Sequence, residues 1–221
     1  MSGSDKTGAD LEPVSQTIVY RTSLGILYIH PKRQPGTFSH LRLDSGLGHF
    51  ARYSSIIQKF EIFDKIARSK DGRVTLAMAN EEVVVGYVTG VYPDAGERWS
   101  KLGDLMYELS TIEVSRNYRR LGLASKLVEA TISDDFFEDK IVYMNGFSWH
   151  WDTDGNGLTL PQYRKVMIRL LKPFGFQECY TNEPNIAIRE ENLFMVRIGS
   201  RVPEEAKKRF RDLRFGIVNR I

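Results

Sequence analysis

The segment 107–130 carries the residues best suited to bind a charged small molecule. It reads YELSTIEVSRNYRRLGLASKLVEA, a strand pattern that ends at Val114, a short basic loop, and a helix pattern with apolar Leu123, Leu127 and Val128. The start of a helix leaves backbone N–H groups without partners and carries the positive end of the helix dipole. The sequence therefore predicts an anion site, of the kind that holds a diphosphate, at this junction.

Residues around the junction strengthen that prediction. Arg119 and Arg120 supply positive charge, and the small residues Gly122 and Ala124 let a ligand approach the backbone closely. The pattern matches neither a Walker loop nor a Rossmann dinucleotide turn, because the glycines or the lysine that those need are missing. An ordinary strand-to-helix turn with solvated arginines is the alternative interpretation.

The surrounding elements predict a mixed sheet with helices packed on it. Strands are expected at 17–20 and 26–30 (a hairpin), 73–79, 83–92, 107–115, 140–147, 175–180 and 193–198. Helices are expected at 50–67, 119–133 and 161–171. This order of elements predicts an α/β (α+β) domain.

Composition excludes several classes of protein. The 221 residues are 42% apolar and 27% charged, which is typical of a globular chain. The single cysteine, Cys179, excludes an internal disulfide and a cysteine-rich zinc site. No apolar run reaches the roughly 20 residues that a membrane span needs, and the first residues lack an apolar signal core. We therefore expect a cytoplasmic protein without membrane contact.

The positive charge is concentrated at one end of the chain. The net charge is +3, but residues 201–221 alone carry +4, which leaves −1 for residues 1–200. We predict a flexible N-terminus (1–16), one domain (17–200) and a basic, helix-prone tail (201–221). Because the domain is close to neutral, we expect the tail to dock a protein partner rather than nucleic acid.

The R-x-x-G-x-A sequence after a strand ending in E-V resembles motif A of the GNAT (GCN5-related N-acetyltransferase) family. Further blocks narrow the resemblance to the acetoin-utilization (AcuA) branch of that family, over residues 17–215: 86–100, 108–114, WHWD at 149–152, YRKVM at 163–167 and 195–205. The resemblance implies a mostly antiparallel central sheet, splayed at the acetyl-CoA site, with helices on both faces.

The resemblance also implies acetyl-CoA as cosubstrate and assigns residues to it. The pyrophosphate would lie in a cradle of Arg119, Arg120, Gly122, Leu123 and Ala124. The pantetheine arm would run along Ile112, Glu113 and Val114.

Glu108 lies at the offset from motif A where histone-acetylating members of the family have a catalytic glutamate, so the resemblance implies a general base. A base is needed because a lysine amine, with a pKa of about 10.4, is almost fully protonated at neutral pH. Strand alternation predicts that Glu108 shares a face with Ile112 and Val114, opposite Glu113. Glu113 is the second candidate, and a surface carboxylate without catalytic role is the alternative for Glu108.

The general acid is less clear from the pattern. Many GNAT enzymes have a tyrosine four residues before a Gly-Phe pair, but that position is Leu171 in this chain. Tyr163, two turns earlier in the same expected helix, is the substitute, unless the thiolate leaves without an acid.

Aromatic residues near the expected site predict a groove for a protein substrate. Trp99, Trp149 and His150 are its candidates, although packing explains Trp99 equally well and explains His150 better. Residues 152–157 match the first half of a calcium loop, but its twelfth position is Tyr163 instead of glutamate. No metal site is therefore expected.

The resemblance implies a protein lysine N-acetyltransferase that modifies the active-site lysine of acetyl-CoA synthetase and inhibits it. Two alternatives stay open. One is an acetyl-CoA-binding regulator that clamps the synthetase without turnover, and the other is a GNAT enzyme acting on a small amine.

Overall fold

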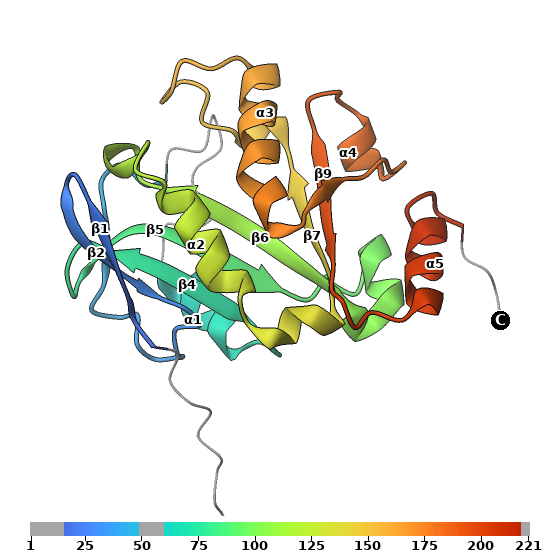
Figure 1. Ribbon diagram of the computed structural model, residues 1–221, viewed down its shortest axis with the longest axis horizontal. Helices are drawn as coiled ribbons and strands as arrows, with labels where there is room; N and C mark the ends of the chain where they lie inside the picture. The colour runs from blue at the N-terminus through green and yellow to red at the C-terminus, as the bar shows by residue number, and fades with distance from the viewer. Residues whose placement is uncertain (1–15, 49–59, 218–221) are drawn as a thin grey trace, which may run out of the picture.

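A single mixed sheet organises the part of the chain that this computed structural model describes, residues 16–48 and 60–217 (Figure 1). The expected flexible N-terminus therefore lies almost wholly outside the described residues, as does the first part of the helix expected at 50–67. The described strands are β1 (Ile18–Thr22), β2 (Gly25–His30), β3 (Arg42–Leu43), β4 (Arg73–Met78), β5 (Val83–Val91), β6 (Met106–Val114), β7 (Ile141–Gly146), β8 (Gln177–Glu178) and β9 (Leu193–Ile198).

The sheet is mostly antiparallel, as expected. Its strand order is β1-β2-β4-β5-β6-β7-β9-β8, with β3 paired to β5. Only the β3–β5 and β6–β7 pairs among the described strands are parallel. The hairpin expected near the start of the chain is β1–β2.

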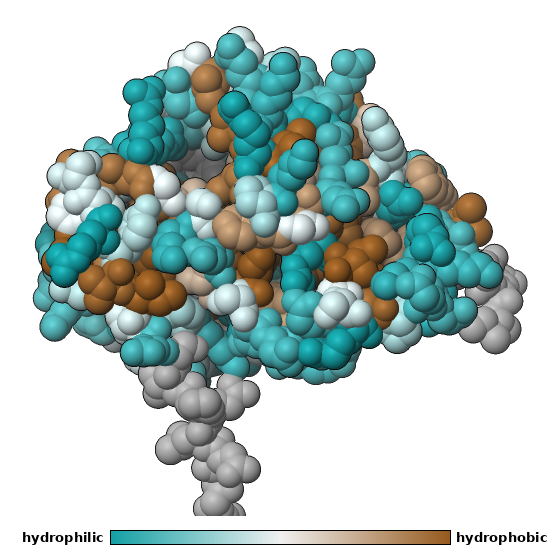
Figure 2. Space-filling model, viewed as in Figure 1, coloured by the Kyte–Doolittle hydropathy of each residue, from teal (hydrophilic) through white to brown (hydrophobic). Residues whose placement is uncertain are grey.

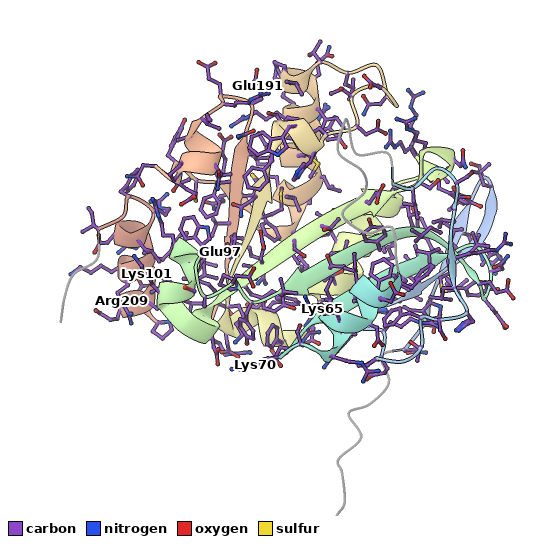
Figure 3. All side chains as sticks on the ribbon, turned by 180° about the vertical axis from the view of Figure 1, so that it is seen from behind. Lys65, Lys70, Glu97, Lys101, Glu191 and Arg209 are labelled. Carbon is purple, nitrogen blue, oxygen red and sulfur yellow. The ribbon has the colours of Figure 1, made fainter. Side chains whose placement is uncertain are left out.

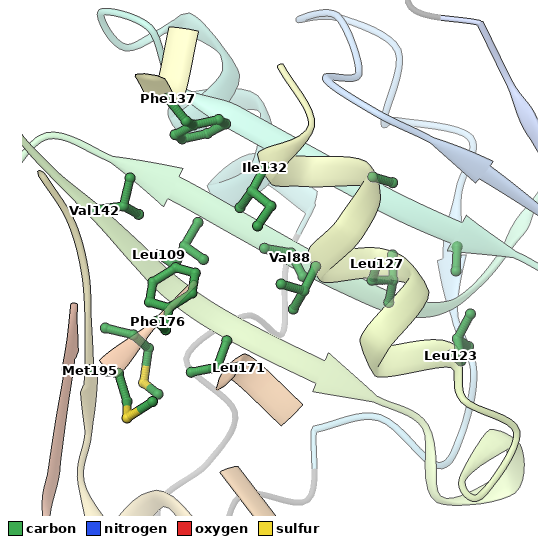
Figure 4. Packing of buried hydrophobic residues seen from close by; sticks show 14 of the residues in the cluster. Val88, Leu109, Leu123, Leu127, Ile132, Phe137, Val142, Leu171, Phe176 and Met195 are labelled. Carbon is green, nitrogen blue, oxygen red and sulfur yellow. The ribbon is translucent and has the colours of Figure 1, made fainter. Parts of the chain in front are cut away.

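Helices cover both faces of the sheet. The described helices are α1 (Phe60–Arg68), α2 (Leu123–Ile132), α3 (Leu160–Leu171), α4 (Pro184–Ala187) and α5 (Glu204–Leu213). In Figure 1, α2 and α3 lie in front of the sheet and α1 lies behind it. Leu127 and Ile132 of α2 pack toward Val88 and Leu109 of the sheet in the main core (Figure 4). No described helix has the length and apolar character to cross a bilayer.

The strands β6 and β7 separate after a short stretch of pairing. They pair only from Met106 and Ile141 to Glu108 and Tyr143. Beyond that point β6 stays with β5 and β7 stays with β9, so the two strands diverge (Figure 1). The predicted splay of the sheet is therefore present, and Glu108 is the last paired residue before it.

A β-bulge in β6 changes which side chains share a face. Leu109 pairs with Gly90 but Thr111 pairs with Thr89, so Ser110 is an extra residue on β6. The alternation is inverted beyond it, and Leu109 and Ile112 both pack in the core under α2. Glu108 and Glu113 therefore share the opposite face. The prediction that Glu108 shares a face with Ile112 and Val114 is wrong, because a bulge is invisible to simple alternation.

The helix expected in the basic tail is α5, and its apolar side is buried. Phe210 and Leu213 belong to a second core cluster with Trp99 and Phe194. The Trp99 and Phe194 rings are stacked, with their centroids 4.6 Å apart. Whether the domain ends at residue 200 stays a prediction, but α5 packs against the same cluster as β9.

We expect Phe210→Ala to lower the free energy of unfolding by about 3–5 kcal/mol, the usual cost of emptying an aromatic site in a core. Phe215→Ala is the matched control, because that ring is 46% exposed. Urea denaturation of both variants measures the difference. Equal small losses would mean that α5 contributes little to the stability of the fold.

Candidate functional site

A cavity of about 720 Å³ opens where β6 ends and α2 begins. Its walls come from the end of β6, the 116–122 loop, the first turn of α2, the 152–158 loop and α3. Figure 2 shows this face of the molecule hollowed between the 152–158 loop and the start of α2. The structure brings eight predicted cofactor residues to this one cavity: Ile112, Glu113, Val114, Arg119, Arg120, Gly122, Leu123 and Ala124.

The start of α2 is built to leave backbone N–H groups facing this cavity. The helix begins at Leu123, later than expected, after a turn in which Arg120 and Gly122 adopt positive φ angles of 64° and 73°. The N–H of Lys126 donates to the carbonyl of Gly122 (3.1 Å), so the three N–H groups before it precede the helical hydrogen bonds. A Cβ at residue 122 would lie 2.9 Å from the Tyr20 hydroxyl.

Asp152 organises the basic side of the cavity. Its carboxylate, 5% exposed, accepts two hydrogen bonds from Arg116 (2.8 and 2.5 Å) and one from Arg119 (2.6 Å). The Gly155 N–H adds a fourth. Burial alone raises the pKa of Asp152, but the bonds from the two arginines outweigh it and hold the pKa at about 2. The two guanidinium groups are thereby fixed at the cavity wall.

The arginines keep capacity for an anionic ligand. Two arginines against one carboxylate leave a positive balance, and Nη1 of Arg119 is buried with no hydrogen-bond partner among the described residues. The sequence did not indicate that Asp152 pairs with Arg116 and Arg119: there it stands only in the WHWD block and in the half-matched calcium loop. Within residues 16–48 and 60–217, no cluster of acidic, histidine or cysteine side chains is arranged to hold a metal.

A small cavity of about 70 Å³ lies in the gap between β6 and β7. Tyr163 lines both this gap and the large cavity, and its ring stacks on Trp151 with the centroids 5.2 Å apart. Burial raises the pKa of Tyr163, so its hydroxyl is protonated at neutral pH. Leu171, the position of the usual tyrosine, is fully buried beside Phe176 (Figure 4).

A third cavity, of about 800 Å³, lies on the other side of the gap and contains Glu108. Its walls come from the 95–101 segment, which includes the start of the 3-10 helix η1 (Arg98–Leu105), and from Asn145, Glu183 and Gly216. Burial raises the pKa of Glu108 to about 7, and the nearby charges of Glu97 and Asp94 add to the effect. Figure 3 shows Glu97 and Lys101 on this side, near Arg209 of α5.

The other predicted catalytic carboxylate has structural partners. Glu113 is buried and accepts hydrogen bonds from the N–H of Gly48 (2.7 Å) and from the Tyr87 hydroxyl. These bonds tie the 44–48 loop to β6. Glu113 lines the large cavity as predicted, but its carboxylate is directed to the opposite face of the sheet.

The predicted groove residues differ in their surroundings. Trp99 lines the third cavity, but it is only 2% exposed and lies mainly in the core. Trp149 stacks on Phe147 with the centroids 4.9 Å apart, and it is not among the residues that line these three cavities. His150 lines the gap, and burial lowers its pKa, so the ring is neutral at pH 7.

Comparison with known proteins gives the family. Residues 40–150 match the family model described as the acetyltransferase (GNAT) family. The acetoin utilization protein AcuA of Bacillus subtilis is 36% identical over 160 residues, which is 72% of this chain and 75% of that protein. The chain belongs to the AcuA-like branch of the GNAT acetyltransferases. It is therefore an N-acetyltransferase, and enzymes of this family use acetyl-CoA.

Two further relatives extend the comparison. AcuA of Bacillus licheniformis is 34% identical over 72% of this chain and 75% of that protein. The crystal structure of an acetoin utilization protein from Exiguobacterium sibiricum superposes with a TM-score of 0.83 at 31% identity, over 90% of this chain and 93% of that one. This chain therefore shares its fold with that protein over nearly all of its length, beyond the 40–150 match.

We expect Gly122→Glu to weaken the binding of CoA more than tenfold, because the new carboxylate would lie at the helix start and meet the Tyr20 hydroxyl. Isothermal titration with CoA measures the loss. Gly25→Glu is the control, since Gly25 also has a positive φ but sits in the β1–β2 turn with open space around it. Unchanged CoA affinity in the Gly122 variant would exclude this cavity as the cofactor site.

Proposed function

We propose that this enzyme transfers the acetyl group of acetyl-CoA to a lysine of a protein, and that the protein is acetyl-CoA synthetase, which it inhibits during acetoin utilisation. The observation that carries the proposal is the position of Glu108. Its carboxyl, with a pKa raised to about 7, lies at the end of the β6–β7 pairing and lines a cavity that is separate from the cavity of cofactor size. The names of the relatives support acetoin utilisation. A cytoplasmic location stays a prediction.

The large cavity fits acetyl-CoA. The N–H groups at the start of α2 and Nη1 of Arg119 would hold the pyrophosphate, because both offer hydrogen-bond donors without partners among residues 16–48 and 60–217. The pantetheine arm would follow the backbone at Ile112–Val114, where no described strand pairs with β6 on the β7 side. That path leads into the gap between the strands, so the thioester would lie within reach of Tyr163.

The third cavity suits a lysine ammonium group. Glu97, Glu108 and Glu183 line it together with Arg98 and Lys101. Arg98 is paired with Glu183 and Lys101 is exposed, so Glu97 and Glu108 are the carboxylates that would attract a positive charge there. Glu108 takes one proton from the ammonium group, and the neutral amine attacks the thioester carbon. A C–N bond forms, the C–S bond breaks, and the nitrogen releases its second proton to water. The sulfur leaves as thiolate, which takes a proton from Tyr163 or water. Backbone N–H groups near Ile112–Val114 would stabilise the oxyanion.

We expect Glu108→Gln to lower kcat/KM for the synthetase by about 10²–10⁴-fold, the usual contribution of a general base. A carboxyl accepts a proton only when ionised, so wild-type activity should fall as the pH drops through about 7, and the variant should lack this limb. The measurement is mass spectrometry of the synthetase lysine over a pH series. Glu190→Gln, at an exposed carboxyl, is the control.

Other outcomes of this assay select the alternatives. Full activity of Glu108→Gln would remove Glu108 as the base. Co-elution with the synthetase and inhibition without a lysine mass shift would indicate a stoichiometric regulator. Acetylation of free polyamines but not of the synthetase would indicate a small-amine enzyme.

The basic face of α5 is the expected docking surface for the synthetase. Lys208, Arg209 and Arg211 are exposed there, while the apolar side of the helix is buried. Arg209 lies on the same side of the molecule as Glu97 of the third cavity (Figure 3).

We expect replacement of Lys208, Arg209 and Arg211 together by alanine to weaken synthetase binding by about tenfold at low salt, with a smaller effect at high salt. Affinity for CoA should not change, because α5 does not line the large cavity. Surface plasmon resonance at two salt concentrations tests both statements. Equal synthetase affinity in the variant and the wild type would place the docking surface elsewhere.

A further inference from the structure

Asn145 occupies the point where the two substrates of the proposed reaction would meet. It lies on β7 just past the last residue paired with β6, and its backbone neighbour is Phe194 of β9. It lines both the gap between β6 and β7 and the third cavity. Its side chain is on the same face of β7 as Tyr143, two residues before it.

Of the two polar atoms of the Asn145 amide, Nδ2 is hydrogen-bonded and Oδ1 is without a partner among the described residues. Its Nδ2 donates a hydrogen bond to Oε1 of Glu108 at 3.1 Å. Its Oδ1 is buried and has no hydrogen-bond partner within the part of the chain that the structure describes. A buried carbonyl oxygen without a partner is unfavourable and uncommon in native proteins, so such an atom at a cavity wall points to a ligand that donates to it.

We infer that Asn145 positions the acceptor amine: its Oδ1 accepts one N–H of the incoming primary amine while its Nδ2 holds Glu108 beside it. The inference rests on the proposed transfer to an amine. An ammonium group has three N–H donors. One would bind Asn145 and a second would lose its proton to Glu108. The amine nitrogen would then carry a free lone pair beside Asn145, at the wall that the third cavity shares with the gap.

The pKa of Glu108 reports on its hydrogen bond with the Asn145 amide. Burial is the main cause of its raised pKa, and the hydrogen bond from Asn145 opposes that rise. The Tyr143 hydroxyl donates to Oε2 of Glu97 at 3.3 Å, which keeps that carboxylate near Glu108. The charged and titratable groups that face this region are Asp94, Glu97, Arg98, Lys101, Tyr143 and Glu183.

The test compares Asn145→Ala with Asn145→Asp in the full chain. In Asn145→Ala we expect the KM for the acceptor lysine to rise about tenfold, the KM for acetyl-CoA to stay unchanged, and the low-pH limb of kcat/KM to move to higher pH. Asn145→Asp keeps an acceptor oxygen but loses the donor and adds a negative charge. In Asn145→Asp the low-pH limb of kcat/KM should move to a still higher pH than in Asn145→Ala. The KM for the acceptor lysine should stay closer to the wild-type value.

A second measurement separates this inference from the proposed function. A 13C NMR titration of the Glu108 carboxyl without any acceptor should show its pKa raised in both variants. Asn80→Asp is the matched control, because Asn80 only caps the β4–β5 turn through its Oδ1. If the wild type acetylates no amine, the proposed function fails, and the titration still reports the Asn145–Glu108 bond. If the wild type is active but Asn145→Ala keeps the wild-type acceptor KM, or its Glu108 titrates unchanged, the inference is wrong.

Discussion

The short pairing of β6 with β7 is the constraint on which the site depends. The two strands share hydrogen bonds only as far as Glu108 and Tyr143, and each then follows its other neighbour. The separation creates the gap, leaves the β7-side edge of β6 without a partner among the described strands, and places Glu108 where the strands part. The bulge at Ser110 then directs Glu108 to one face and Ile112 to the other. Without the extra residue, the carboxylate and the cofactor-lining side chains would face the same cavity.

The charged groups differ between the two sides of the gap, and this difference would suit two substrates of opposite charge in the proposed reaction. On the cofactor side, Asp152 fixes Arg116 and Arg119 and leaves a positive balance for phosphate groups. On the acceptor side, Glu97 and Glu108 favour an ammonium group. In the proposed reaction, the two arginines would attract a phosphate and the two carboxylates would attract an ammonium group, so each substrate would favour its own side. Burial of Glu108 is compatible with this arrangement, because a carboxyl with a pKa near 7 is partly ionised at neutral pH and can accept a proton.

Sequence reasoning predicted what depends on neighbours along the chain. The strand, loop and helix around Gly122 follow from apolar spacing and small residues, so the eight cavity-lining residues could be found without a structure. Sequence reasoning did not predict features that depend on contacts between segments far apart in the chain. The bulge at Ser110 depends on the register with β5, and the partner of Arg119 is Asp152, 33 residues away. For Trp99 the sequence left a groove and packing as equal interpretations, because nothing in it indicates that Phe210 of α5 packs in the same cluster.

Hydrogen bonds hold the end of α5 against the wall of the third cavity. This contact gives the positive charge of the tail a role in the proposed function. Arg98, which lines the third cavity beside Glu97, donates to the carbonyl of Arg214 at the end of α5 and forms an ion pair with Glu183 of the same cavity. The carbonyl of Arg214 also accepts from the Thr181 hydroxyl. The end of α5 is thus held against the wall of the acceptor cavity, with its cations outward. A partner with an acidic surface that binds α5 would place a nearby lysine at the cavity mouth, so attraction at α5 and attraction of the ammonium group by Glu97 and Glu108 would act on the same docked complex.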